Sequence, residues 1–269
     1  MDEPACATAA PGTRAAPVST ARLGLYGGSF DPPHQAHLVL ARAAAVPGTR
    51  AAPVSTARLG LYGGSFDPPH QAHLALARAA AAQLGLDRLL WLPAGRPWQK
   101  ARELAPDADR LAMLRLLVAD EPRFAIDERE LHRAGPSYTI DTLRELRTEL
   151  PKAGLFLVLG QDQLAGLPSW HDWTALLDAA TLAVASRAGD TFAPPPEVAA
   201  RAPRLERLEM PPMAVSSTAI RAHLAAGGTA RELAPAMVSP EVAGYIDSRR
   251  LYRTPVPDPS ASPDAPARS

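Results

Sequence analysis

The chain has 269 residues, and its 28 lysines and arginines balance its 28 aspartates and glutamates, which gives a formal net charge of zero. This length suits one large α/β domain or two small ones, and a hydrophobic share of 46% excludes global disorder. The balanced charge argues against a dedicated binder of nucleic acid or of anionic membranes, because such proteins carry a strong basic excess.

Cysteine content and hydrophobic patterning favour a cytoplasmic protein. Cys6 is the only cysteine in the sequence, which excludes an intramolecular disulfide framework and a cysteine-based zinc site. No apolar run approaches the roughly 20 residues of a membrane-spanning helix. The N-terminal sequence MDEPACATAA is acidic where a secretory signal would be basic. We therefore expect a cytoplasmic protein that binds neither nucleic acid nor membranes.

Two nearly identical segments open the chain. Residues 11–38 and 47–74 share the sequence PGTRAAPVSTARLGLYGGSFDPPHQAHL. Because the repeat stops after two copies, it indicates a tandem duplication or an error in the gene or its start site rather than a solenoid.

Only the second copy continues into a complete helix and a buried strand. In the first copy, Pro47 and Gly48 end the helix early, and no second strand follows. We therefore predict that residues 58–82 are the working copy and that residues 1–57 are an appendage carrying a truncated duplicate. The alternative is that the two copies compete for the same place in the fold.

From residue 58 onward, strand and helix patterns alternate. Short apolar runs predict strands at 59–64, 88–93, 123–127, 155–159, 181–186 and 204–210. Apolar residues at helical spacing predict helices at 70–84, 107–120, 137–150, 216–226 and 239–248. Ser137 is the expected N-cap of the third helix, and residues 190–203 are expected to form a loop. The alternation predicts a doubly wound, Rossmann-like α/β fold with a parallel sheet over residues 58–252. The Pro/Ser/Ala-rich end, 253–269, is expected to be disordered.

The sequence GGSFDPPHQAH, residues 63–73, joins the first expected strand to the first expected helix. Gly63 and Gly64 allow the backbone to approach a ligand closely. His70 and His73 are three residues apart, on one face of the first helical turn. A helix N-terminus favours phosphate, and two imidazoles there can donate to its oxygens. The pattern favours a phosphate site over the alternative of two surface histidines. The fingerprint GxGxxG is absent from this turn, which disfavours a nicotinamide-dependent dehydrogenase.

The motif GGSFDPPHQAH resembles the signature of the nucleotidyltransferase α/β-phosphodiesterase superfamily. More narrowly, the chain is similar to the bacterial nicotinate-nucleotide adenylyltransferases. Four further segments fit that family in order and spacing: LPAGRPWQK (92–100), ERELHRAGPSYTIDTL (128–143), LGQDQLAGLPSWHDW (159–173) and VSSTAIRAHL (215–224). The two middle motifs, at 128–143 and 159–173, point to nicotinate mononucleotide. Pantetheine-phosphate adenylyltransferases typically have threonine at the position of His70 and lack the SYT and PSW segments. Ala72 departs from the family motif, which often has glycine there.

The resemblance implies transfer of the adenylyl group of ATP to nicotinate mononucleotide, with release of pyrophosphate. It implies that His70 and His73 are catalytic. The implied ATP-binding residues are Gly63, Gly64, Ser65, Phe66, Lys100, Ser216, Ser217, Thr218 and Arg221. The implied substrate-binding residues are Thr139, Asp162, Trp170 and Arg187. A tryptophan face at position 170 can stack on a pyridine ring.

The expected chemistry needs no general base and no covalent intermediate, because the nucleophile is the phosphate of the mononucleotide, already anionic at neutral pH. Rate enhancement is expected from in-line placement and charge neutralisation. Mg²⁺ is expected on the ATP phosphates, with no metal ligand assigned to the protein. The sequence leaves four alternatives open: nicotinamide mononucleotide as acceptor, phosphopantetheine as acceptor, a catalytically silent nucleotide-binding protein, and a defective product of the duplication. It also leaves open whether the chain forms a homo-oligomer.

Overall fold

A computed structural model describes residues 57–97, 102–187, 192–201 and 203–253. Within these ranges the strands form a six-stranded, all-parallel sheet of order β3-β2-β1-β4-β5-β6. The strands are β1 (Arg58–Gly64), β2 (Arg88–Pro93), β3 (Phe124–Ile126), β4 (Gly154–Gly160), β5 (Thr181–Arg187) and β6 (Leu205–Met210). The predicted Rossmann-like architecture is confirmed, and the bounds of each strand lie within one residue of the predicted ones. The duplicate in residues 1–56, Lys100 and the chain end from residue 254 lie outside the described residues.

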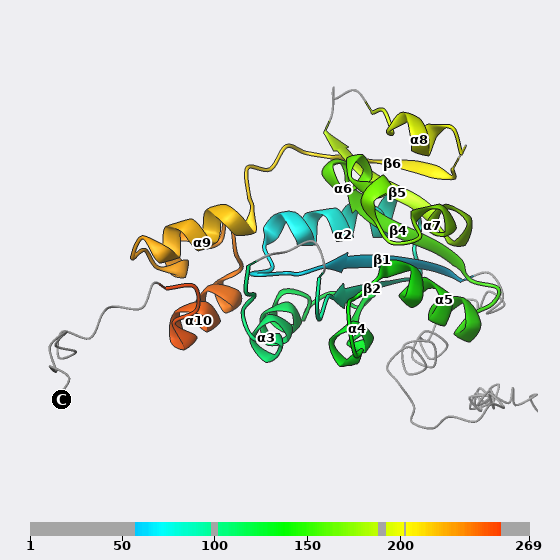
Figure 1. The fold of residues 1–269 in the computed structure, drawn as a ribbon. Coiled ribbons are helices and arrows are strands. Elements are labelled where there is room, and N and C mark those ends of the chain that lie inside the picture. Colours follow the sequence, from blue (N-terminus) through cyan, green and yellow to red (C-terminus); the bar gives the residue numbers. More distant parts are fainter. Residues whose placement is uncertain (1–56, 98–101, 188–191, 202, 254–269) are drawn as a thin grey trace, which may run out of the picture. The chain divides into compact units, whose positions relative to one another are not determined.

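Helices cover both faces of this sheet (Figure 1). They are α2 (Gln71–Gln83), α3 (Asp107–Leu117), α4 (Arg129–His132), α5 (Thr139–Glu149), α6 (Gln161–Ala165), α7 (Trp173–Ala179), α8 (Pro196–Ala199), α9 (Ser217–Ala225) and α10 (Pro240–Arg249). Two 3₁₀ turns accompany them, η2 (Leu167–Ser169) and η3 (Ala230–Leu233). None of the described helices is long and apolar enough to cross a bilayer.

The central strands are apolar throughout because successive side chains enter two different cores. In β1, Leu59 and Leu61 point into one core and Tyr62 into the other. The Tyr62 core is completed by buried residues of α2, α3, α9 and α10, and the Leu61 core by buried residues of α5, α6, α7 and α8. This double burial explains why the pattern of the strands is a continuous apolar run rather than an alternation.

Two local predictions were wrong. Ser137 is not a helix N-cap, because α5 begins at Thr139 and Tyr138 holds the N-cap position without a side-chain cap. The segment 190–203, predicted as a loop, contains the short helix α8. Its residue Val198 is fully buried in the Leu61 core, and this tertiary contact explains a helix that is too short to show a periodic pattern.

The order of the strands reverses between β1 and β4, which creates the crevice where ligands bind in doubly wound sheets. Pairing of β1 with β4 ends at Leu61 and Leu157, whereas pairing of β1 with β2 continues to Gly64 and Pro93. The carboxyl ends of β1 and β4 therefore separate, and the loops that follow them face each other across a gap. In Figure 1, helices α9 and α10 lie at the end of the sheet toward which the β1 and β2 arrows point.

Candidate active site

A cleft of about 360 Å³ lies at the carboxyl ends of β1 and β4. The residues that follow β1 form one wall, and residues 157–160 of β4 form the other. Eight predicted site residues line this cleft: Gly63, Gly64, Ser65, Phe66, His73, Thr139, Trp170 and Ser217. The structure therefore gathers residues from four distant sequence motifs at the switch point of the sheet.

The Gly-Gly turn has open space at Gly63 but not at Gly64. A Cβ atom built at Gly63 would meet no atom within 4 Å, whereas one at Gly64 would come within 3.0 Å of the Phe66 ring. Phe66 has a left-handed backbone, with φ of 46°, and its buried ring packs against Trp91 and His73 with centroid distances of 5.2 Å. These aromatic contacts over-determine the strained conformation, so the turn that borders the cleft is held rigidly.

The two histidines of the motif lie together at the start of α2, as predicted. His70 is the N-cap residue, and its backbone N–H donates to His73 Nδ1 at 3.2 Å. The two imidazole rings stack, with centroids 3.6 Å apart and planes 14° from parallel. Because His73 Nδ1 accepts a hydrogen bond, the neutral ring carries its proton on Nε2. His73 lines the cleft, and in this tautomer it is a hydrogen-bond donor.

His70 differs from His73 in its environment. Its side chain is buried, and burial lowers its pKa to about 4. The ring is therefore neutral at pH 7. Its Nδ1 atom is buried and makes no hydrogen bond to any described residue. Buried polar atoms without partners are rare in proteins and concentrate at functional sites. His70 is not among the residues that line the cleft, and it contacts the site through the stacked ring of His73.

This low pKa predicts a pH-dependent stability. The unfolded chain binds the histidine proton near pH 6.5 and the folded chain only near pH 4, so acid favours the unfolded state within that window. Between pH 7 and pH 5, His70 should lower the free energy of unfolding by about 2 kcal/mol. His70→Asn keeps an N-cap residue but removes the titrating group. Urea denaturation at both pH values should show that wild type loses about 2 kcal/mol more than this variant. Equal losses would contradict the assignment.

The N-terminus of α9 meets that of α2. Ser216 Oγ accepts from Ala219 N at 3.1 Å, which confirms it as the N-cap of α9. Ser217 Oγ donates to the Pro68 carbonyl at 2.9 Å and also lines the cleft. Arg221 Nη1 donates to the Asp67 carbonyl at 2.6 Å. These two bonds join segments about 150 residues apart, so the positive ends of two helix dipoles flank one site.

Thr218 and Ser216 are exposed beside this junction and are not among the residues that line the cleft. Thr218 Oγ1 accepts from Arg221 Nη2 at 3.3 Å, which keeps the guanidinium at the junction. The structure thus places all four predicted residues of the second phosphate motif at the start of α9, with Ser217 closest to the cleft.

The far end of the cleft is built by α5, α6 and η2. Thr139 is the first residue of α5, and Trp170 follows η2 and packs partly into the Leu61 core. Asp162 lies exposed on α6 and is not among the residues lining the cleft, whereas Gln163 beside it is. Arg187 ends β5, and its side chain lies outside the described part of the structure, as does Lys100.

Several residues of the site were not predicted. Ser137 Oγ accepts from the backbone N–H groups of Gly95 and Arg96, at 3.2 and 3.3 Å, and so joins two loops at the cleft. Glu130 also lines the cleft; its carboxyl is buried, its pKa is raised by that burial, and it accepts from Thr142 Oγ1 at 2.8 Å. Both lie within the motif at 128–143, but only tertiary contacts reveal their roles.

Arg110 is a further residue that was not predicted. It is fully buried, and its guanidinium donates to three backbone carbonyls of the loops around the cleft, those of Ser65 (2.7 Å), Ala94 (2.8 Å) and Ala105 (3.2 Å). The sequence did contain a signal for this role, because Arg110 lies on the same helical face as the core residues Leu114 and Leu117. A charged side chain on a core-facing stripe needs hydrogen-bond partners that compensate its burial.

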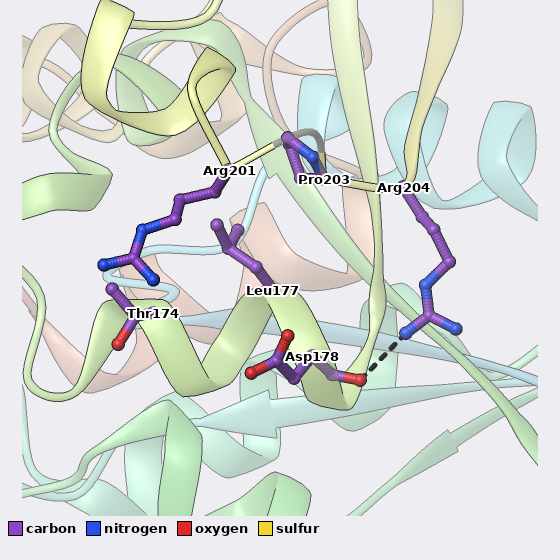
Figure 2. Close-up of a pocket in the computed structure, with 6 residues that line it drawn as sticks. All are labelled: Thr174, Leu177, Asp178, Arg201, Pro203 and Arg204. Carbon is purple, nitrogen blue, oxygen red and sulfur yellow. Dashed lines mark hydrogen bonds between the residues drawn. The ribbon is translucent and has the colours of Figure 1, made fainter.

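A second hollow lies away from the cleft, beside the C-terminal end of α7 (Figure 2). It is lined by Thr174, Leu177, Asp178, Arg201, Pro203 and Arg204. Arg204 Nη2 donates to the Asp178 carbonyl at 2.9 Å, which satisfies a terminal carbonyl of α7. None of the predicted site residues whose side chains the structure describes lines this hollow.

Comparison with known proteins identifies the family of the chain. The family model described as cytidylyltransferase-like matches residues 61–223. A probable nicotinate-nucleotide adenylyltransferase of Methylibium petroleiphilum is 54% identical over 234 residues, which cover 87% of this chain and 93% of that protein. A protein of the same description from Albidiferax ferrireducens is 48% identical, over 87% of this chain and 98% of the relative.

Solved structures share the fold at lower sequence identity. The nicotinic acid mononucleotide adenylyltransferase of Plasmodium falciparum, complexed with NaAD, superimposes with a TM-score of 0.62 at 18% identity. The match covers 73% of this chain and 97% of the Plasmodium chain. At this identity, the likeness supports the arrangement of the sheet and its helices.

Proposed function

Since this chain belongs to the nicotinate-nucleotide adenylyltransferases, within the cytidylyltransferase-like family, we propose that it transfers the adenylyl group of ATP to nicotinate mononucleotide in NAD biosynthesis. The observation that carries the proposal is the meeting of the α2 and α9 N-termini at a cleft lined by His73. Two helix ends and a donating imidazole suit a triphosphate placed against a second anion.

ATP occupies the α2 and α9 end of the cleft in this proposal. The backbone of Gly63, Gly64, Ser65 and Phe66 borders its phosphates. Ser216, Ser217, Thr218 and Arg221 bind the two terminal phosphates, and Lys100 adds a further cationic contact from the loop after β2. His70 and His73 serve as the catalytic pair, with His73 Nε2–H donating to the α-phosphate. The tied helix ends and the stacked imidazoles support this assignment.

Nicotinate mononucleotide occupies the other end of the cleft. The Trp170 ring stacks on the pyridine ring, and the N-terminus of α5 at Thr139 receives its carboxylate. Asp162 binds ribose hydroxyls, and Arg187 contacts the bound nucleotide. The partly buried Trp170 and the position of Thr139 in the cleft wall support this placement.

The reaction then needs positioning rather than a protein nucleophile. The mononucleotide phosphate attacks the α-phosphorus of ATP in line, the bond to the β-phosphate oxygen breaks, and pyrophosphate leaves. Donors at the helix ends are aligned before reaction and stabilise the charge that develops on the α-phosphate and on the leaving group.

Mg²⁺ fits this site as a partner of the phosphates. No group of three or more His, Cys, Asp or Glu side chains that could hold a metal occurs in the described part of the chain. The donor set at the helix ends consists of N–H groups, hydroxyls and a guanidinium, which bind phosphate oxygens rather than cations. We therefore propose that the ion is held mainly by ATP and neutralises phosphate charge when bound.

We place the activity in residues 58–252 and propose that 1–57 and 253–269 are an appendage and a tail. We also propose a cytoplasmic location, because the reaction consumes ATP.

Pyrophosphate release with Mg-ATP tests the function directly. Nicotinate mononucleotide, nicotinamide mononucleotide and phosphopantetheine are offered in turn to the full chain. We expect the highest kcat/KM with nicotinate mononucleotide. A preference for either other acceptor would replace the proposed substrate. ATP binding without pyrophosphate release from any acceptor would identify a silent nucleotide-binding protein instead.

A further inference from the structure

The C-terminal end of the domain returns to the phosphate-binding motif. After α10, the chain passes through two non-glycine residues with left-handed backbones, Arg250 (φ 52°) and Tyr252 (φ 64°). The Tyr252 hydroxyl then donates to Asp67 Oδ1 at 2.7 Å. Asp67 belongs to the sequence GGSFDPPH and is fully buried. A residue near the end of the domain therefore contacts the centre of its first motif.

Asp67 joins four parts of the structure. Besides the Tyr252 hydroxyl, its carboxylate accepts from Ala105 N at 3.2 Å and lies 2.5 Å from Arg102 Nη1. Its backbone carbonyl accepts from Arg221. One residue thus links the turn after β1, the segment before α3, the start of α9 and the chain after α10. His70 and the α2 N-terminus follow only three residues later.

The geometry of Tyr252 indicates a constrained contact. A non-glycine residue stays in the left-handed region only where its surroundings over-determine the conformation. The Tyr252 side chain packs on the Tyr62 core while its hydroxyl reaches Asp67. Burial raises the pKa of the phenol, so the hydroxyl stays protonated and donates.

We propose that Tyr252 is a positioning residue for ATP: its hydroxyl fixes the Asp67 carboxylate, and through Asp67 it holds the α2 and α9 N-termini in the arrangement that receives the triphosphate. This inference rests on the proposed function, since it concerns the ATP end of the same cleft. Tyr252 has no proposed role at the nicotinate end of the cleft, which is built by α5, α6 and η2.

Tyr245 provides a matched control on the same C-terminal segment. Its hydroxyl donates to Asp109 Oδ1 at 2.8 Å, and Asp109 is a buried carboxylate on α3. Tyr245→Phe and Tyr252→Phe each delete one hydroxyl that donates to a buried carboxylate. Both keep the aromatic ring and its packing. Of the two tyrosines, only Tyr252 contacts the phosphate-binding motif, through Asp67.

The test measures both KM values, the Tm, and the Kd for a non-hydrolysable ATP analogue in full-length variants. We expect Tyr252→Phe to raise the ATP KM and the analogue Kd by about tenfold, as for loss of one hydrogen bond to a charged group. The KM for nicotinate mononucleotide should stay within about twofold of the wild-type value, because the variant removes no hydrogen bond at the nicotinate end of the cleft. Tyr245→Phe should lower Tm without changing the ATP KM.

Three results would overturn the inference: an unchanged ATP KM in Tyr252→Phe, an equal rise in both KM values, or the same rise in Tyr245→Phe. Failure of the proposed function is seen separately, because it would abolish pyrophosphate release by the wild-type chain with nicotinate mononucleotide. The analogue Kd needs no turnover and would still report whether Tyr252 positions the ATP site.

Discussion

Replacement of His73 by alanine is expected to lower kcat for pyrophosphate release by about 10²–10³-fold, the typical loss of one preorganised donor to a developing charge. The KM values for both substrates should change only a few-fold, because such a donor acts more strongly in the transition state than in the ground state. Steady-state kinetics with nicotinate mononucleotide and Mg-ATP give both quantities.

The structural basis for this expectation is the orientation of the ring. The His70 backbone N–H holds His73 Nδ1, and the Phe66 and His70 rings contact the imidazole from two sides. A ring fixed in this way needs no reorganisation when charge develops on the α-phosphate. His73→Asn should recover part of the activity, because an amide also donates, but it lacks the reach and the stacking surface of the imidazole.

His37 is the matched control, since it occupies the same position in the duplicate motif as His73 does in the second copy. His37→Ala should leave kcat unchanged, and a chain beginning at Ala57 should retain full activity. If His37→Ala abolished turnover while His73→Ala had no effect, the first copy would be the one that works. A gain in Tm on removal of residues 1–56 would instead indicate that the duplicate competes with the second copy for the same place in the fold.

The sequence allowed much of the fold to be predicted because the signals are local. The runs LGLYGG and LFLVL predict strands from their own apolar character, and the structure places them side by side as β1 and β4. The prediction that two histidines lie together at a helix start is likewise local, because it depends only on their being three residues apart. Their stacked rings confirm it.

The features that could not be predicted depend on contacts between distant segments. Ser137 was interpreted as a helix cap because nothing nearby shows that its hydroxyl bridges Gly95 and Arg96. Asp67 and Tyr252 are 185 residues apart in sequence and 2.7 Å apart in the structure. In each case, the polar group satisfies backbone or carboxylate atoms of a different motif, and no periodicity in one segment encodes that pairing.

Arg110→Met is expected to lower the free energy of unfolding by about 3–5 kcal/mol, the usual cost of removing one member of a buried charged network. The substitution keeps the length and apolar stem of the side chain but leaves three carbonyls without their donor. Its ion-pair partner Asp107 is half exposed, so water solvates that carboxylate and the backbone carbonyls carry most of the loss. Urea denaturation measures the effect.

Arg115 on the same helix provides the control. It pairs with Glu128 at 2.6 Å, but its side chain is 59% exposed, so Arg115→Met should cost less than about 1 kcal/mol. Arg110→Lys should fall between wild type and Arg110→Met, because an ammonium keeps the charge but cannot span three carbonyls that a planar guanidinium reaches. A loss below about 1 kcal/mol in Arg110→Met would contradict the network.

The same variant should also lower kcat/KM at temperatures where it remains folded. Ser65 follows β1 and Ala94 follows β2, and both line the cleft. Arg110 fixes the carbonyls of both. Without it, the N–H groups on the cleft side of these loops lose their orientation toward the phosphates, and positioning supplies much of the rate in this chemistry. Stability and activity are therefore expected to depend on the same buried cation, since two of the loops that it holds together border the proposed active site.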